Sequence, residues 1–429
     1  MRTLTWWQLS LLGVGCTIGT GFFLGSSIAI KKSGPAVFIP FLLAGIGTYI
    51  VYDALAKMSV NHPDPGSFRT YAQKAFGRWA GFGNGWMYLI AEMLIMGSQL
   101  IALAIFTRFW FPDVPLWLLA TIYAILGLLL ILTGLKGFEK AENLFGLLKT
   151  AAIMMFILIA LAIWAGWIGD RTAVQMQSFD LSTIFSEGLK GVWLALLYAF
   201  YAFGGIEVMG LVVIDLKDRH EAPKAGRVMI WLLSILYLGS ILLALILVSW
   251  TQISSKESPF TTALKSAKLP YVTDIFNGIL IIAGFSTLVA SLYAVVTILI
   301  SLAEDKHAPA TFAKKGKGKI PPTTFLFALC GLFVSIVIAF LLPNQIFEYM
   351  TTAAGLMLLY NWLFILFTYA KWMKLSKVEW LKVGVGTLLI LVTVSGTLGE
   401  QASRYGFYVS LLFMAMVVVA TGIRSKKLV

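Results

Sequence analysis

The chain has 429 residues, of which 59% are hydrophobic and only 12% are charged, and its mean hydropathy is +0.86. This composition is far too apolar for an ordinary soluble globular domain. The formal net charge of +13 would suit a nucleic-acid binder, but most lysines and arginines fall on one side of the topology set out below, as the positive-inside rule predicts for a membrane protein. We therefore expect an all-α membrane protein with a single polytopic domain over residues 1–429.

Twelve apolar segments are long enough to cross a bilayer, which takes about 20 apolar residues. They cover residues 6–30, 35–59, 80–106, 114–134, 143–168, 186–213, 228–250, 272–302, 323–342, 345–369, 378–397 and 404–422. This count places both termini on the cytoplasmic side of the plasma membrane, where the lysines and arginines concentrate. The basic run 314–319 is then an inner loop that faces anionic membrane lipid.

The first segment is interrupted by glycines at positions 13, 15, 19, 21 and 25. Each glycine inside a helix costs roughly 1 kcal/mol relative to alanine. Backbone that unwinds at membrane depth is tolerated only where protein buries it or where it lines a cavity. The stretch 15–21 therefore predicts a broken first helix with a binding site at the break. The alternative is that these glycines only allow close helix packing.

Two features precede the third segment. Asp53 and Lys57 are four residues apart in the second segment, so we expect a structural ion pair between them. Residues 60–80 carry apolar side chains at helical spacing with basic side chains between them. This pattern predicts a short amphipathic helix on the cytoplasmic face, which would either lie at the membrane interface or pack against the bundle.

A second glycine interruption, at residues 204–210, falls in the sixth segment. Interruptions in the first and sixth segments indicate two repeats of opposite topology, which is typical of inverted-repeat transporters. Repeat one would cover 6–168 and repeat two 186–369, while the last segments, 378–422, would be peripheral or support dimerisation. Two broken helices lying antiparallel offer N–H groups to a carboxylate and carbonyls to an ammonium, the two charges of an α-amino acid.

Three ionisable residues inside predicted spans are candidates for proton coupling, because an unpaired charge is costly there. Lys149 either snorkels to the cytoplasmic surface or faces the broken first helix as a desolvated ammonium that releases and takes up a proton. Glu207 follows the second break and would pair locally or bind a proton. Glu92 lies near mid-membrane and is either functional or hydrogen-bonded to Gln99 or to backbone.

Enzyme motifs are missing from the sequence. The three histidines, His62, His220 and His307, fall in predicted loops, so a serine hydrolase would lack its base within the membrane. There is neither an HExxH zinc pair nor a P-loop. We expect no metal and no cofactor, and uphill transport would draw on an ion gradient or on exchange. A sensor that binds amino acids without moving them is an alternative, which the short termini disfavour.

Several stretches together resemble the amino acid–polyamine–organocation transporters, and in particular the bacterial amino acid permeases. The resemblance runs from about Trp7 to Arg424. Its most specific stretches are residues 15–24, 63–72, 76–78, 85–86, 203–207, 221–224 and 303–309. It implies the LeuT-like fold, a five-plus-five inverted repeat with discontinuous first and sixth helices. It also implies import of an amino acid by alternating access.

The resemblance implies which residues contact the substrate. They are Thr17, Gly19, Thr20, Gly21, Tyr201, Phe203, Gly204 and Gly205. The turn 19–21 would bind the carboxylate, through the Thr20 hydroxyl and the Gly21 amide. The carbonyl of Thr17 and those around Tyr201 and Gly204 would receive the ammonium, with the Tyr201 ring as a lid. The substrate side chain would face the third, eighth and tenth segments.

The resemblance also bears on coupling and gating. Lys149 matches a lysine that takes the place of a sodium ion in proton-coupled relatives, which implies proton symport; amino acid exchange or polyamine antiport is the alternative. Glu92 stands where relatives carry an aromatic or apolar residue, and would favour a cationic substrate or add a proton site. Relatives usually have glutamate at the position of Lys57 and arginine at that of Thr297, so the cytoplasmic gate must differ here.

Overall fold

The computed structural model describes residues 4–64, 66–133, 135–169, 184–314, 320–341 and 346–428, so positions 315–319 of the basic run lie outside the described residues. The helices in chain order are α1 (Trp6–Thr17), α2 (Thr20–Phe23), α3 (Gly25–Ser33), α4 (Phe38–Asn61), α5 (Ser67–Phe76), α6 (Arg78–Thr107), α7 (Leu116–Leu132), α8 (Leu135–Trp164), α10 (Gly188–Ala202), α11 (Ile206–Val212), α12 (Ala222–Leu247), α13 (Pro259–Ser266), α14 (Pro270–Glu304), α15 (Pro322–Leu341), α16 (Ile346–Trp372), α17 (Lys377–Gly396) and α18 (Gln401–Leu428). Short 3-10 turns join several of them. The all-α prediction is confirmed for the described ranges.

Ten helical segments of the described chain are long and apolar enough to cross a membrane, and the apolar helix α7 adds 17 residues. The predicted count of twelve spans is not reached by this measure. The break leaves α1 with only 12 residues, and the rest of the first predicted segment continues into the second as one stretch, Thr20–Asn61. The arrangement is that of a multi-pass membrane protein, while twelve spans and the inverted repeat stay predictions.

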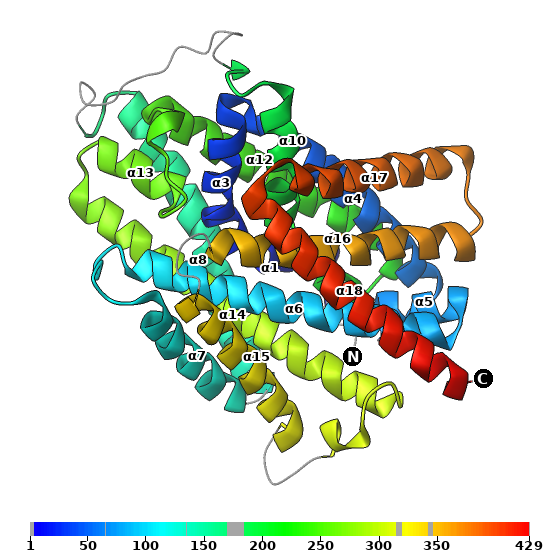
Figure 1. Cartoon of the computed structure of the whole chain (residues 1–429). Helices are drawn as coiled ribbons and strands as arrows, with labels where there is room; N and C mark the ends of the chain where they lie inside the picture. The colour runs from blue at the N-terminus through cyan, green and yellow to red at the C-terminus, as the bar shows by residue number, and fades with distance from the viewer. Residues whose placement is uncertain are drawn as a thin grey trace.

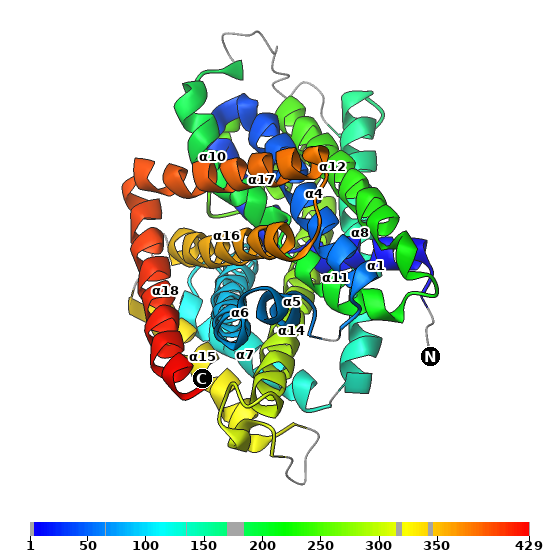
Figure 2. The same cartoon turned by 90° about the vertical axis from the view of Figure 1, so that its right-hand side faces the viewer.

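The centre of the bundle is formed by α6 and α16, which run side by side through the middle of the molecule (Figure 1). In the most apolar stretch of each of these helices 78% of the residues are buried, against 33% in α17 and 17% in α18. The last two helices therefore lie at the edge of the bundle, as Figure 2 shows for α18. Many of their apolar side chains are exposed.

The chain before α1 is held by backbone hydrogen bonds to the turn that follows α11. The Leu4 amide donates to the Asp215 carbonyl at 3.1 Å, and the Lys217 amide donates to the Leu4 carbonyl at 2.9 Å. These bonds form an isolated parallel bridge between Leu4 and Leu216. The segments that begin the first broken helix and end the second are thus joined.

The amphipathic helix predicted between residues 60 and 80 is present as α5. Its Phe68 and Tyr71 side chains are buried, and Tyr71 stacks on Trp372 of α16 with 5.4 Å between ring centroids. The helix packs chiefly against α6 and α16. Of the two alternatives, the packed loop helix is the one observed, because its apolar face is covered by protein.

The predicted pair of Asp53 and Lys57 is confirmed, with 3.0 Å between Nζ and Oδ2. The same lysine also contacts Glu379 of α17 at 3.0 Å, and Lys382 contacts Asp53 at 2.9 Å. Tyr369 donates a hydrogen bond to Glu379 at 2.8 Å. We call these five residues the α4–α17 network; it ties a central helix to a peripheral one.

The polar contacts at the end of α14 do not involve Thr297, which is exposed. They are made instead by Arg69 of α5, which forms an ion pair with Asp305 and donates a hydrogen bond to Ser301 at 3.0 Å. Close by, the Trp86 indole donates to the His307 carbonyl at 3.1 Å. Burial and the nearby Arg69 lower the pKa of His307, so its neutral form is favoured.

Candidate functional site

The first helix is broken where the glycine pattern predicts. Between Thr17 and Thr20 the backbone is extended, with φ −67° and ψ 117° at Ile18 and φ −166° and ψ −162° at Gly19. The last carbonyls of α1 and the first N–H groups of α2 therefore lack intrahelical partners. The hydroxyls of Thr17 and Thr20, 6% and 1% exposed, have no hydrogen-bond partner among the described residues. Hydrogen-bond donors and hydrogen-bond acceptors without intrahelical partners therefore lie together at this break.

The second break separates α10 from α11. Gly205 lies in the left-handed region with φ +112°, a conformation that side chains other than glycine rarely adopt. The Glu207 carboxylate accepts a hydrogen bond from the Gly205 amide at 3.0 Å and another from the Trp362 indole. Glu207 is 1% exposed. Of the two roles considered for it, local pairing is what the structure displays.

The two breaks lie side by side and antiparallel. The first half of one helix, α1, packs against the second half of the other, α11, while α2 and α3 pack against α10. A Cβ atom built on Gly205 would lie 3.1 Å from the Cys16 carbonyl oxygen, and one built on Gly21 would lie 3.0 Å from the Tyr201 ring. The glycines thus serve both proposed purposes, since they permit the break and also let the two backbones approach.

The walls around the breaks come from α6, α14 and α16. A Cβ on Gly19 would meet Thr287 of α14, and one on Gly284 would lie 2.9 Å from the Thr20 methyl group. The Tyr201 hydroxyl lies 2.6 Å from the Ser98 hydroxyl of α6. The sequence analysis did not assign Ser98, Gly284 or Thr287 to the binding site. Small and hydroxyl residues inside otherwise apolar spans were the available signal.

The residues predicted to contact the substrate do not all face the same space. Seven of them lie at the two breaks: Thr17, Gly19, Thr20, Gly21, Tyr201, Gly204 and Gly205. Phe203 instead is fully buried against Tyr237 of α12, with 5.2 Å between ring centroids. Tyr237 in turn stacks on Phe22 at 3.7 Å. Phe203 therefore packs the outside of the second break.

Lys149 lies at the end of α1, although it belongs to α8. Its side chain is 0% exposed, and Nζ donates a hydrogen bond to the Gly15 carbonyl at 3.2 Å. A snorkelling lysine would reach the surface instead. The structure therefore places this ammonium against the broken helix, which is the second of the two arrangements considered.

Glu92 of α6 lies deeper in the bundle and is 7% exposed. Its carboxyl group lies beside the hydroxyls of Tyr88 and Ser291 and within electrostatic range of Glu207. The predicted contact with Gln99 is not formed, because the side chains that interact with the Glu92 carboxyl are those of Tyr88, Ser291 and Glu207. Within the described ranges, histidine, cysteine, aspartate and glutamate nowhere form a group of three or more that could hold a metal ion.

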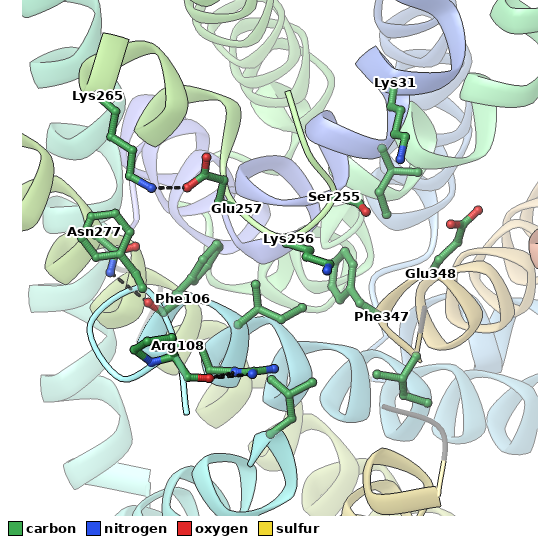
Figure 3. A pocket seen from close by; sticks show the side chains of 16 residues that line it. Lys31, Phe106, Arg108, Ser255, Lys256, Glu257, Lys265, Asn277, Phe347 and Glu348 are labelled. Carbon is green, nitrogen blue, oxygen red and sulfur yellow. Dashed lines mark hydrogen bonds and ion pairs between the residues drawn. The ribbon is translucent and has the colours of Figure 1, made fainter. Parts of the chain in front are cut away.

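A cavity of about 660 Å³ lies where α3 and α6 end and α16 begins (Figure 3). Four cations and two carboxylates line it: Lys31, Arg108, Lys256, Lys265, Glu257 and Glu348. Lys265 pairs with Glu257 at 2.5 Å, and Glu348 pairs with Lys32 at 2.7 Å, so the remaining charge of the rim is positive. Ile28 of its wall lies seven residues beyond Gly21, about 10 Å along a helix.

Residues 8–395 match the family model described as amino acid permease. The chain is 53% identical over 425 residues to the uncharacterized transporter YcgH of Bacillus subtilis. The alignment covers 99% of this chain and 95% of that protein. It is 31% identical to the aromatic amino acid transport protein AroP of Corynebacterium glutamicum, over 95% of this chain and 94% of that one. Identity to the gamma-aminobutyric acid permease of Bacillus subtilis is 29%, over 92% and 86%.

Proposed function

The chain belongs to the amino acid permease family, whose members are transporters and not enzymes, and we propose that it imports an α-amino acid across the plasma membrane in symport with protons. Transport would proceed by alternating access in a fold of twelve spans with an inverted repeat and cytoplasmic termini. The observation that carries this proposal is the antiparallel pair of breaks, with the unpartnered hydroxyls of Thr17 and Thr20 between them.

The substrate's two charges would bind to the two kinds of helix end. Its carboxylate would accept hydrogen bonds from the Thr20 hydroxyl and from the amides of residues 20 and 21, which begin a helix and carry positive partial charge. Its ammonium would donate to the carbonyls of Thr17 and Gly204, where α1 and α10 have ended. No arginine or aspartate is then needed to hold the zwitterion.

Proton coupling would act through Lys149. While protonated, its ammonium holds the Gly15 carbonyl near the end of α1 at 3.2 Å. When the proton leaves, the end of α1 loses one hydrogen-bond donor and one positive charge. The free-energy difference between the two conformations of the transporter would then change. A ligand or proton shifts such an equilibrium only by its differential affinity for the states. Glu207 would assist by holding the start of α11.

The route to the breaks would begin at the cavity between α3, α6 and α16, which we assign to the outer side. The Arg69–Asp305 ion pair and the α4–α17 network lie at the opposite end of the bundle, and these contacts would keep that end closed. These contacts would stand in for the inner contacts that relatives make through residues at positions 57 and 297. Opening the inner side must break some of them.

Reconstitution in proteoliposomes tests the proposal. The substrates in the relatives' names, aromatic amino acids and γ-aminobutyrate, belong in the first panel together with the other protein amino acids. We expect an inward proton gradient to drive accumulation of at least one of them above the external concentration, and a protonophore to abolish it. Uptake only against a preloaded counter-substrate would indicate an exchanger or antiporter, and binding without any uptake would indicate a sensor.

A further inference from the structure

The cavity shown in Figure 3 has two carboxylates in its lining, and lysines already neutralise both of them. Glu257 pairs with Lys265, with 2.5 Å between Oε2 and Nζ. Glu348 pairs with Lys32 at 2.7 Å and also accepts a hydrogen bond from the Tyr198 hydroxyl at 3.1 Å. The acidic side chains of the cavity therefore do not balance the charge of its remaining cations.

Three cations of the lining have no carboxylate partner among the described residues: Lys31, Arg108 and Lys256. Arg108 donates hydrogen bonds from Nε and Nη2 to the Pro112 carbonyl, at 3.0 and 2.6 Å, and this neutral acceptor does not cancel its charge. The three side chains come from α3, from the end of α6 and from the loop before α13, and Figure 3 shows them converging on the same cavity. Like charges gathered at one concave site create a positive potential that attracts anions.

The rest of the lining is largely apolar. Phe106, Phe109 and Phe347 contribute aromatic rings, and Leu116 and Ile346 contribute aliphatic side chains. The volume of about 660 Å³ falls within the range of roughly 300–1,000 Å³ that is typical of sites for small organic molecules. A simple inorganic anion would use only the cations, and an uncharged hydrocarbon would use only the apolar walls. A carboxylate attached to an apolar body would use both.

We propose that this cavity is a second binding site, separate from the helix breaks, for carboxylates that have an aromatic or aliphatic body and no ammonium group. The breaks offer partners for both charges of an α-amino acid. The cavity offers partners for the carboxylate only, since Glu257 and Glu348, which could receive an ammonium, are occupied by lysines. A carboxylate bound here would obstruct the route from the outer side and inhibit uptake without being transported. This inhibition rests on the proposed function, whereas the binding itself does not.

Isothermal titration calorimetry with the full chain in detergent tests the binding, with 3-phenylpropionate as the probe. We expect saturable binding, and the uncharged analogue 3-phenylpropionamide should bind at least about tenfold more weakly because it lacks the charged acceptor. The double variant Lys31→Gln/Lys256→Gln should raise the Kd of the acid at least about fivefold, since it removes two exposed cations. Lys190→Gln removes an exposed lysine of α10 outside the cavity and is the matched control, which should leave the Kd unchanged.

Thr20→Ala distinguishes the cavity from the breaks, because it removes a donor of the proposed substrate site. It should leave the Kd of 3-phenylpropionate within about twofold of the wild-type value, since the two sites share no residue. A Kd that rises in Thr20→Ala and not in the double lysine variant would place the ligand at the breaks and overturn the proposal. Equal binding of the acid and the amide, or no saturable binding of the acid, would overturn it as well.

Uptake in proteoliposomes tests the inhibition. External 3-phenylpropionate should inhibit gradient-driven uptake of the amino acid substrate, and the double lysine variant should need at least about fivefold more of it for half inhibition. Binding in the calorimeter without inhibition of uptake would refute the position of the cavity on the route. Absence of gradient-driven uptake for every amino acid would refute the proposed function, while the calorimetric comparison would still decide whether the cavity binds carboxylates.

Discussion

At the scale of single residues, the end of α1 depends on a side chain from another helix. Lys149 of α8 reaches the Gly15 carbonyl without contact with solvent. A buried ammonium is retained only where it is hydrogen-bonded or paired. In the proposed coupling, loss of a proton from Lys149 would weaken its hydrogen bond to the Gly15 carbonyl and so alter the end of α1.

Lys149→Ala should therefore uncouple transport. We expect accumulation driven by a proton gradient to fall at least about tenfold, while exchange of substrate across the membrane persists in part, because the breaks themselves are unchanged. Both quantities are measured in proteoliposomes loaded with and without substrate. Lys190→Ala, which removes an exposed lysine of α10, is the control. Gradient-driven uptake that survives undiminished in Lys149→Ala would refute the coupling role.

Gly205 marks the second break and carries a positive φ of 112°. Gly205→Ala should destabilise the protein by roughly 1–2 kcal/mol from backbone strain alone, and further because the methyl group would approach the Cys16 carbonyl. Thermal unfolding in detergent measures this change. Gly239→Ala is the matched control, since that glycine lies inside α12 with free space around it, and the substitution should stabilise by up to about 1 kcal/mol. Equal melting temperatures for the two variants would contradict the strain argument.

The positions of the two helix breaks were largely predictable from individual residues, but which side chains face them was not. Gly205 needs the left-handed φ that other residues rarely adopt, while Gly19 and Gly21 leave room for the close approach of Thr287 and Tyr201. Phe203 shares the same stretch yet turns toward Tyr237, and no local pattern distinguishes a side chain that faces the break from one that packs behind it. Which roles the predicted residues play stays a prediction.

At the scale of helices, α17 is the element whose attachment is least visible in the sequence. The α4–α17 network joins Asp53 and Lys57 to residues more than 300 positions away. The local pair at positions 53 and 57 follows helix spacing, and only the fold brings the second carboxylate and the second lysine to it. In the same way, the pattern of α5 required an apolar face to be covered but left open whether lipid or protein would cover it.

Asp53 is the central member of this network because both lysines contact its Oδ2 atom. Asp53→Ala should lower the free energy of unfolding by roughly 1–3 kcal/mol, since it leaves two lysines facing each other without their shared carboxylate. Thermal unfolding in detergent at low and high salt measures the loss. Lys74→Ala removes an ion pair whose lysine is 44% exposed and should cost below about 1 kcal/mol. The idea fails if Asp53→Ala is no more harmful than this control.

At the scale of the whole molecule, the distribution of basic residues predicts the orientation of the bundle in the membrane. Lys256 and Lys314 are both exposed. Lys256 precedes α14 in the chain and Lys314 follows it, so we expect them on opposite faces of the membrane. Single cysteines at these positions, in a chain whose Cys16 and Cys330 are replaced by alanine, should react differently with a membrane-impermeant thiol reagent in whole cells. We expect Lys256→Cys to be labelled from outside and Lys314→Cys only after permeabilisation. The reverse pattern would invert the topology and place the cavity on the inner side.

The bridge between Leu4 and Leu216 has a mechanical consequence. Leu4 lies two residues before α1, and Leu216 ends the turn that follows α11, so the bridge connects the first half of one broken helix to the second half of the other. Because of this bridge, a rotation of α1 would also move α11, and a rotation of α11 would also move α1. In the alternating access proposed above, opening of the inner side would therefore move both half-helices together, as one rotation about residues 18–19 and 203–205.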